Sequence, residues 1–511
     1  MSHYRLQICV LGYLTLPLLI FWWGWFGWWI ALPATVALIW WLWVVNVRTS
    51  AHHFSLPISH CAGLVLLAFG WAYLAGVGGF RPQHFDYFKH NLIFNNLVRL
   101  AWPVQYADGT YLCYYNAYYL PPALLAKWVG GLGMVHWYTF GWAWLGLNLL
   151  FVQLYRLGGW GLVAFFMFFN SPESILLVYE AFKSPETLAY TLSDLWTNDH
   201  TIELIFTPGG LTYPSHAESI GAVPQHAIAG WLVSLFFLDQ IMANKHQIQA
   251  VKLIGIGVVC AYWSPLVAVG LLPFFLYKMP NINYQMWHGI GLLPMALPAA
   301  VYYAGHVPLH DPHGWIGQFI STPHQYLLLA TFLVLESVVW GVSIWLIEKK
   351  YRALKTDFGL VLCAVGVLFA LSLYRYGHFN DLARRASLPA TLVLCWGVFK
   401  VLAFLLQSKN WTIPAKTLVL VVCLSVLLPI KHHLKWLTPH PYMSIVDKSV
   451  VDFAPQTIHY LGQYHQGEFD AAAQYLGDKK SWYWQYAAPR TNDKDTVIQK
   501  NKSLNRSITP H

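Results

Sequence analysis

Charged residues are scarce in this chain. Asp, Glu, Lys and Arg make up only 10% of its 511 residues, whereas 57% of the residues are hydrophobic. A soluble domain carries about 25% charged residues, so the composition excludes an ordinary soluble protein. Apolar runs long enough to cross a bilayer as helices alternate with short polar connections. The sequence therefore predicts an all-α polytopic membrane protein.

Cysteine patterns and nucleotide-binding motifs are also missing. Six of the seven cysteines lie in apolar runs, and their spacing fits neither a disulfide framework nor a zinc site. The chain has no P-loop, no glycine-rich dinucleotide turn and no nucleophile elbow. Its net charge of +9 is spread over short connections, without the clustered side chains that read nucleic acid. We therefore expect no nucleic-acid partner, no soluble nucleotide-activated donor and no cofactor, and we do not favour a divalent metal.

Three regions are expected along the chain. An N-terminal pair of transmembrane helices folds back at the tryptophan-rich segment Trp23–Trp28. A transmembrane core follows, and a largely polar tail ends the chain. Together they predict a bundle of roughly 11–13 transmembrane helices. The expected boundaries are 1–56 for the pair, 57–430 for the core and 431–511 for the tail.

Basic residues set the expected orientation of these helices. Arg5 and Arg48 flank the N-terminal pair, and Glu348–Lys355 is a strongly basic connection. Lys and Arg favour the cytoplasmic side of a membrane. We therefore place the N-terminus in the cytoplasm and the tail in the periplasm of a bacterial inner membrane. Large loops then face the periplasm, at 78–134, 170–225, 305–324 and 375–387.

The first of these loops brings an acid, a cation and an imidazole together. A helix beginning near Asp86 would place Lys89 and His90 on the same face, three and four residues further on. Exclusion of solvent on one side raises the pKa of a carboxyl group, as suits a general base. Lys89 and Asn91 are candidates to hold a phosphate, and His90 and Asn91 are candidate substrate contacts. The alternative is an interfacial ion pair between Asp86 and Lys89 that has no role in function.

Three arginines in loop 375–387 run against the positive-inside trend. Arg375, Arg384 and Arg385 flank Asn380 and Asp381. Guanidinium groups bind phosphate oxygens through paired hydrogen bonds, so this loop is a candidate site for a phosphate or a pyrophosphate. Asn380 and Asp381 are candidate substrate contacts beside the arginines. Contacts to lipid head groups are the alternative interpretation.

The two remaining loops carry weaker signals. Loop 170–225 has seven acidic residues against one lysine, which suits either a solvated face or a surface for an acceptor. It ends at Gln225 and His226, which are candidates to contact a sugar hydroxyl or a phosphate, although a structural role at the interface is an alternative. Loop 305–324 holds four histidines, but Pro308 prevents a helix from aligning the first two for a metal. These histidines are His306, His310, His313 and His324.

Three stretches resemble the GT-C superfamily of integral-membrane glycosyltransferases. A span is followed by an outer loop with an early acid, in Gly79-Phe80 and then Phe85-Asp86-Tyr87-Phe88. The loop continues into YYLPPALLAKWVGG, at residues 118–131. The later NDLARRASLPA, at residues 380–390, resembles the junction of an outer loop with a span in bacterial proteins of this kind. The likeness is carried by these short motifs and by the architecture of residues 57–430.

The resemblance implies sugar transfer from a polyprenyl-phosphate-linked donor, with inversion at the anomeric carbon. Asp86 would deprotonate a hydroxyl group of the acceptor. Lys89, Arg375 and either Arg384 or Arg385 would neutralise the leaving phosphate, which is the largest contribution to such a reaction. The acceptor would be a periplasmic protein such as a pilin, a surface polysaccharide or a lipid-linked glycan. The active site would face the periplasm.

One position departs from the pattern of that superfamily. Many of its members place two acids together in the first loop, whereas Tyr87 follows Asp86 in this chain. The missing second acid argues against a metal-dependent mechanism. It favours a metal-independent enzyme whose donor is a lipid monophosphate.

Two other classes of protein stay open. A flippase or exporter of lipid-linked glycans would need charged residues within its spans, and Asp239 and Glu336 are the acidic candidates. Asp86 would then be dispensable as a base. A scaffold that only binds partners through its outer loops would tolerate Asp86→Asn.

Overall fold

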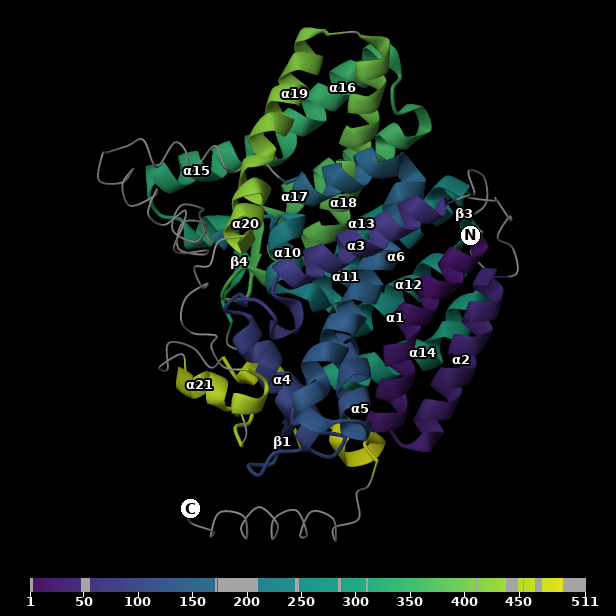
Figure 1. Ribbon diagram of the computed structural model, residues 1–511, viewed down its shortest axis with the longest axis vertical. Helices are drawn as coiled ribbons and strands as arrows, with labels where there is room; N and C mark the ends of the chain where they lie inside the picture. Colours follow the sequence, from purple (N-terminus) through teal and green to yellow (C-terminus); the bar gives the residue numbers. More distant parts are fainter. Residues whose placement is uncertain are drawn as a thin grey trace.

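The described part of the chain is a bundle of helices with three small two-stranded sheets (Figure 1). Among the described helices, six are long and apolar enough to cross a membrane, and five further apolar helices are shorter. The predicted class, an all-α polytopic membrane protein, is therefore confirmed. The computed structural model describes residues 3–46, 56–170, 172, 210–243, 248–283, 286–308, 311–409, 411–437, 449–453, 455–464 and 471–489.

The N-terminal pair consists of two apolar helices. Helices α1 (His3–Trp25) and α2 (Trp28–Asn46) are apolar over their whole length and turn at Phe26 and Gly27. They lie along one edge of the bundle, beside α14 and α12 (Figure 1). Helix α3 (Ile58–Leu74) then packs along α6 and leads to the first expected loop.

Residues 75–168 contain two short helices and one long one. Helix α4 (Tyr87–Arg99) begins directly after Asp86 and ends before Pro103, whose ring cannot continue a helix. Helix α5 (Leu120–Trp128) carries prolines in its first turn, where no backbone donor is needed. Helix α6 (Val135–Phe168) is broken at Gly158 and Gly159, where the backbone leaves the helical conformation. The break separates two apolar stretches of this helix.

The remaining helices complete the bundle. They are α10 (His216–Ala222), α11 (Pro224–Ala243), α12 (Ala250–Trp263), α13 (Pro265–Lys278), α14 (Met286–Tyr303), α15 (Pro323–Leu333), α16 (Val339–Tyr351), α17 (Phe358–Leu371), α18 (Asp381–Ser408), α19 (Ile413–Ser425), α20 (Leu427–Leu437) and α21 (Tyr460–Tyr464). Helix α18 packs against α11, α13 and α17 and lies at the centre of this group of helices.

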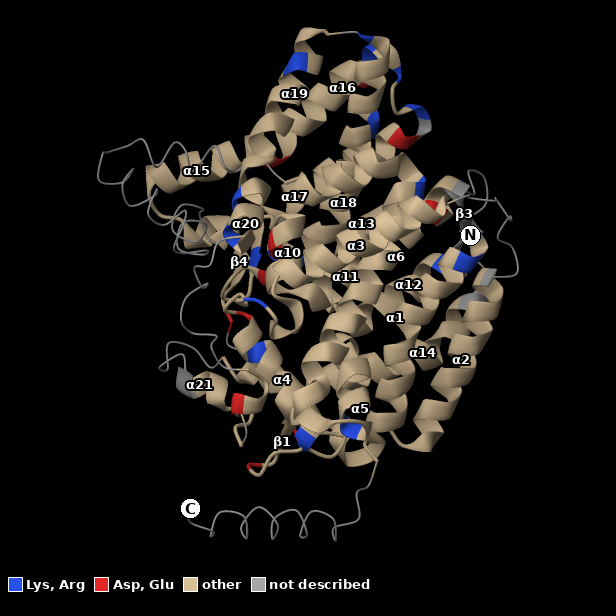
Figure 2. Ribbon diagram, viewed as in Figure 1, with Lys and Arg blue, Asp and Glu red and all other residues tan. Residues whose placement is uncertain are grey.

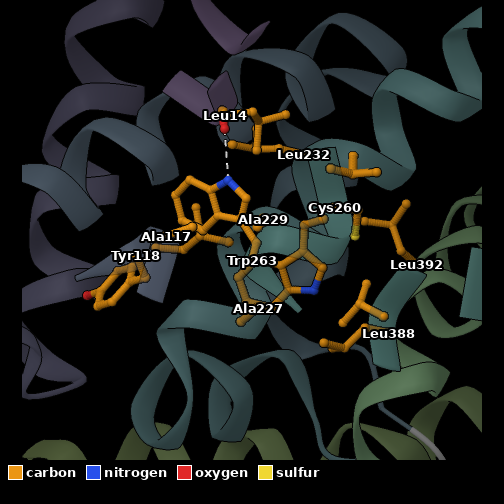
Figure 3. Packing of buried hydrophobic residues seen from close by; sticks show 14 of the residues in the cluster. Leu14, Ala117, Tyr118, Ala227, Ala229, Leu232, Cys260, Trp263, Leu388 and Leu392 are labelled. Carbon is orange, nitrogen blue, oxygen red and sulfur yellow. Dashed lines mark hydrogen bonds between the residues drawn. The ribbon is translucent and has the colours of Figure 1, made fainter. Parts of the chain in front are cut away.

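Close packing of large aromatic side chains against small ones holds the helices together. Trp263 of α12 lies in the core, and its indole Nε1 donates a hydrogen bond to the carbonyl oxygen of Leu14 in α1 at 2.9 Å (Figure 3). Ala227 and Ala229 of α11 lie nearby in the same cluster (Figure 3). In lipid, helices associate through such contacts because the solvent is as apolar as the side chains.

Strand pairing gathers the expected outer loops at one end of the bundle. Strand β1 (Thr110–Leu112) pairs antiparallel with β6 (Leu476–Asp478), and β4 (His313–Trp315) pairs antiparallel with β5 (Tyr374–Tyr376). A further bridge joins His306 to β6. The structure therefore brings described residues of segments 78–134, 305–324 and 375–387 together. The side of the membrane on which this end lies stays a prediction.

The opposite end holds the basic connections. Strand β2 (Ile248–Gln249) pairs with β3 (Ile282–Asn283) there, next to the end of α2. Figure 2 shows lysines and arginines at the ends of α16, α19 and α1, and a tan middle of the bundle that carries few charges. The distribution suits a membrane protein, because charged side chains avoid the hydrocarbon core.

Segment 375–387 is only partly a loop, which corrects the prediction. Helix α18 begins at Asp381, so Arg384 and Arg385 lie in its first turns and are largely buried. Arginine is a good helix former, and its charge interrupts an apolar run without ending a helix. Only 375–380 remains outside the helix.

The end of segment 170–225 is also misplaced by the sequence analysis. Residues 211–225 are buried, and helix α10 forms within them. Ser215 caps this helix by accepting a hydrogen bond from the backbone N–H of Glu218 at 3.0 Å. The other six acidic residues of the segment, Glu173, Glu180, Glu186, Asp194, Asp199 and Glu203, lie outside the described residues, and so does His310.

The region 431–511 is not simply a polar extension. Helix α20 continues to Leu437, and later described residues pack against α4. The side-chain amide of Asn95 donates to the carbonyl oxygen of Val450 at 2.8 Å, and that of Asn96 donates to Gln456 at 3.0 Å. The polar face of α4 thus binds backbone from the end of the chain, a contact that sequence patterns do not encode.

Candidate active site

Asp86 immediately precedes helix α4 and is mostly buried, with 14% of its side chain exposed. Its Oδ1 accepts a hydrogen bond from Lys89 Nζ at 2.6 Å, across one helical turn. The imidazole of His84 lies on the other side, with Nδ1 3.8 Å from Asp86 Oδ2. The structure therefore brings Asp86 and Lys89 together as the spacing predicts, and adds His84, which the sequence analysis missed.

The ionisation of Asp86 differs from expectation. Burial raises the pKa of its carboxyl group. The charges of Lys89, His84 and Arg385 together lower it by more than burial raises it, so the pKa lies well below the usual range. The expected rise in pKa is therefore wrong, because burial here comes with cations. Asp86 is a carboxylate at neutral pH.

Arg385 joins this site from helix α18. Its Nη2 lies 3.6 Å from Asp381 Oδ1, one turn earlier in the same helix. Asn380, before the helix, takes a left-handed conformation with φ 53°, and its Oδ1 accepts a hydrogen bond from the Tyr376 backbone N–H at 3.3 Å. This turn fixes where α18 begins and places Arg385 where its charge lowers the pKa of Asp86.

The other two arginines have different neighbours. Arg384 Nη1 lies 3.8 Å from Glu218 Oε1 of α10. Arg375 lies in β5, where its guanidinium stacks over the ring of Phe319 at 4.8 Å and donates to the carbonyl oxygen of His378 at 2.8 Å. The electrostatic influence on Asp86 comes from Arg385 and not from these two.

His226 and Gln225 lie at the start of helix α11 and are fully enclosed. His226 Nδ1 lies 2.7 Å from the hydroxyl of Ser264, which precedes α13, and its ring lies 4.8 Å from that of Tyr115. Neither amide atom of Gln225 has a hydrogen-bond partner among the described residues. A buried amide without partners suits a position beside a polar ligand.

Four helices begin around this cluster: α4, α11, α13 and α18. His226 joins α11 to the start of α13, and Arg385 of α18 acts electrostatically on both His226 and Asp86. His90 of α4 reaches the backbone in front of α11, at Ala222. Helix N-termini carry partial positive charge and unpaired backbone donors, so their convergence favours an anion.

His90 and Asn91 serve the architecture of the site. His90 Nδ1 lies 2.7 Å from the Tyr119 hydroxyl and Nε2 lies 3.0 Å from the Ala222 carbonyl oxygen, so Nε2–H donates and Nδ1 accepts. The Asn91 amide donates to Gln83 Oε1 at 2.9 Å. Both candidate substrate contacts are thus engaged within the protein, where they fix α4 against its surroundings.

Tyrosines form one wall of the site. Tyr114, Tyr119 and Tyr475 are buried and Tyr115 is half-buried. The four rings lie near one another, with ring centroids of Tyr114 and Tyr475 4.7 Å apart. Tyr114, Tyr115 and Tyr119 belong to a tyrosine-rich run that composition alone makes visible. Tyr475 comes from the end of the chain, and no sequence signal links it to the site.

An apolar groove of about 410 Å³ lies between α13 and α17. Val269, Pro273 and Val367 line it, and Tyr374 and Leu382 lie at its edge. Leu382 directly follows Asp381, so the groove reaches the helix terminus that carries Arg385. A groove of this kind suits a hydrocarbon chain whose polar group lies among the helix N-termini.

No group of three or more metal-binding side chains occurs among the described residues. Comparison with models of known protein families finds no match for the chain. Comparisons with curated proteins and with solved structures find no match either. Functional inference therefore depends on the geometry of the site.

Proposed function

We propose that this protein is a membrane glycosyltransferase of the GT-C type, which transfers a sugar from a polyprenyl-phosphate-linked donor. The observation that carries the proposal is an ionised, mostly buried Asp86 beside Lys89 and Arg385, where four helices begin. This arrangement pairs an acceptor of protons with a site for an anion. Its edge meets an apolar groove that suits the polyprenyl chain.

In the proposed reaction, an acceptor hydroxyl attacks the anomeric carbon of the donor sugar. Asp86 takes the proton of that hydroxyl, a bond forms between the acceptor oxygen and the anomeric carbon, and the bond from this carbon to the phosphate oxygen breaks. The phosphate leaves with the electron pair, and the configuration inverts. Arg385, Lys89 and the helix N-termini stabilise the charge of the leaving group.

The low pKa of Asp86 affects the relative contributions of proton removal and leaving-group stabilisation to catalysis. A carboxylate with a depressed pKa is a weak base, although it is always in the reactive form at neutral pH. Leaving-group stabilisation is therefore the larger contribution, and proton removal follows as the new bond forms. No metal is needed in this scheme.

The proposed location is a bacterial inner membrane, with the site facing the periplasm. The acceptor is a periplasmic protein such as a pilin, a surface polysaccharide or a lipid-linked glycan. Positively charged connections at the opposite end of the bundle support this orientation.

The proposal is tested by glycan mass spectrometry of periplasmic and surface molecules from cells with wild-type protein, without it, or with Asp86→Asn. We expect one glycan to disappear both without the protein and with Asp86→Asn, at unchanged membrane level of the variant. Asp108→Asn is the matched control, because Asp108 is an exposed aspartate of the same loop. A normal glycan in Asp86→Asn cells would rule out the catalytic role.

A flippase or exporter is the second candidate, and one observation favours it. Glu336 is fully buried within a π-helical turn, Val334–Val338, between α15 and α16. Such turns and such intramembrane acids often serve function. Asp239 is instead paired with Arg156, which suits a structural role. Loss of export in Glu336→Gln cells, together with normal export in Asp86→Asn cells, would favour this alternative.

A further inference from the structure

The end of the chain supplies part of the wall of the candidate active site. Strand β6 lies between β1 and the segment that follows α14. The Val307 backbone N–H donates to the carbonyl oxygen of Leu476 at 3.0 Å, and the Asp478 N–H donates to that of Gly305 at 2.8 Å. Strand β6 is thus hydrogen-bonded on both sides by residues that are far from it in the sequence.

The register of this segment leaves little freedom. A Cβ atom at Gly477 would lie 2.2 Å from the Tyr111 ring, so only glycine fits opposite that tyrosine. The Cys113 backbone N–H donates to the carbonyl oxygen of Tyr475 at 2.8 Å. Together these contacts set the position of Tyr475, the residue directly before β6.

The Tyr475 side chain lies within the cluster of charges. It is 1% exposed, and its ring packs 4.7 Å from that of Tyr114. Burial, with Tyr115, Asp86 and Asp381, raises the pKa of Tyr475 well above its ordinary value, while Arg385 lowers it. The phenol is therefore neutral and keeps its proton, close to the residues that the proposed function assigns to the phosphate.

We infer that the Tyr475 hydroxyl donates a hydrogen bond to the donor phosphate held by Lys89 and Arg385. The inference rests on the proposed function and adds a binding residue to it. Asp86 and Asp381 accept hydrogen bonds only, so a phosphate between them needs neighbouring donors. A phenol supplies one without adding charge, and the end of the chain thereby becomes part of the binding site.

The test compares binding of farnesyl phosphate to the purified full-length protein and its variants in detergent, by calorimetry. We expect Tyr475→Phe to bind about tenfold more weakly than wild type, because a hydrogen bond to a charged group is lost. The ring contact with Tyr114 is retained in this variant, so thermal stability should not change. Tyr483→Phe is the matched control, because the Tyr483 hydroxyl donates to the Trp25 carbonyl oxygen at 2.8 Å, within the same segment but in the core.

A second variant tests the position of the segment. Gly477→Ala forces β6 away from Tyr111 and should weaken binding as much as Tyr475→Phe does, with no further loss in the double variant. If the wild type binds farnesyl phosphate and Tyr475→Phe binds it with the same affinity, the inference is overturned and the proposed function stands. Absence of farnesyl phosphate binding in the wild type would overturn the proposed function and the inference with it.

Discussion

At the scale of single residues, neighbours on a helix reach different partners. Arg384 and Arg385 are adjacent in sequence, yet one contacts Glu218 and the other contacts Asp381 near Asp86. Successive residues of an α-helix point about 100° apart, since 3.6 residues complete a turn. The sequence pattern predicts a loop over this segment, and a loop gives no basis for distinguishing the two arginines.

This difference leads to a prediction for the arginines. Arg385→Gln should weaken binding of farnesyl phosphate by about 10- to 100-fold, because a charge-assisted hydrogen bond contributes about 1.5–3 kcal/mol. Calorimetry with purified protein measures the effect. Among variants of the three arginines, Arg385→Gln should also show the largest loss of sugar transfer.

Arg375→Gln is the matched control for that experiment. Arg375 stacks on Phe319 in the β4–β5 sheet, away from the residues that influence Asp86. We expect its loss to leave the affinity for farnesyl phosphate within about twofold of wild type. Equal losses in the two variants would contradict the assignment of Arg385.

His90 makes stability depend on pH. Burial, and the charge of Lys89, lower its pKa from 6.5 to about 3. The unfolded chain therefore takes up a proton below pH 6.5 that the folded protein does not, and stability present above this pH is lost as the pH falls. At pH 5 the loss is about 2 kcal/mol.

Thermal unfolding of the purified protein at pH 7.5 and pH 5 checks this expectation. His90→Gln should be less stable than wild type at pH 7.5 and should lose less stability on acidification. His313→Gln is the control, because His313 is exposed in β4. The same loss of stability on acidification in His90→Gln and wild type would show that other groups carry the pH dependence.

At the scale of helices, the boundaries that proline and glycine define are those that sequence predicts best. Ser264-Pro265 separates α12 from α13, and Gly158-Gly159 interrupts α6. The start of α18 at Asp381 carries no such signal, because a left-handed Asn380 begins it. The sequence predicts a helix that begins near Asp86. It does not predict that backbone from Val450 and Gln456 binds the polar face of that helix.

Helices α13 and α18 are in unusually close contact beside the candidate site. A Cβ atom at Gly270 would lie 2.1 Å from the carbonyl oxygen of Ala386, the residue directly after Arg385. Gly270→Ala should therefore push α18 away and destabilise the protein by about 1–3 kcal/mol, as overpacking does. Thermal unfolding in detergent measures the change, and binding of farnesyl phosphate should weaken with it.

Gly366→Ala is the matched control for the helix contact. Gly366 lines the same groove from α17, but no atom lies within 4 Å of the position that its Cβ would take. Since alanine favours helices over glycine by about 1 kcal/mol, this variant should be as stable as wild type or slightly more so. A destabilised Gly366→Ala together with an unchanged Gly270→Ala would contradict the role given to this contact.

At the scale of the whole molecule, hydrophobic runs predict the class but not the site. Apolar length identifies spans such as α1, α2 and α18, because the bilayer sets that length. The site depends on contacts between distant segments, such as Tyr475 with Tyr114 and His226 with Ser264. A single sequence records no such pairing, so the tail was expected to be separate from the core.

The common end of the loops leads to a prediction about orientation. Single cysteines at His378, Lys480 and Lys355 are suitable for labelling because all three positions are exposed. The background should lack the three exposed native cysteines, Cys9, Cys61 and Cys423. A membrane-impermeant maleimide added to spheroplasts should label His378→Cys and Lys480→Cys directly, and Lys355→Cys only after permeabilisation.

The three positions test separate steps of the argument. His378 follows β5 and Lys480 follows β6, and both strands belong to the end that holds Asp86, so these two cysteines must label from the same side. Lys355 follows α16 and lies in the strongly basic connection, which the positive-inside rule places in the cytoplasm. Labelling of Lys355→Cys alone would invert the orientation and move the candidate site to the cytoplasm, where a periplasmic acceptor could not reach it. Labelling of all three from one side would contradict the assignment of spans, because α16, α17 and α18 must carry the chain between the two ends.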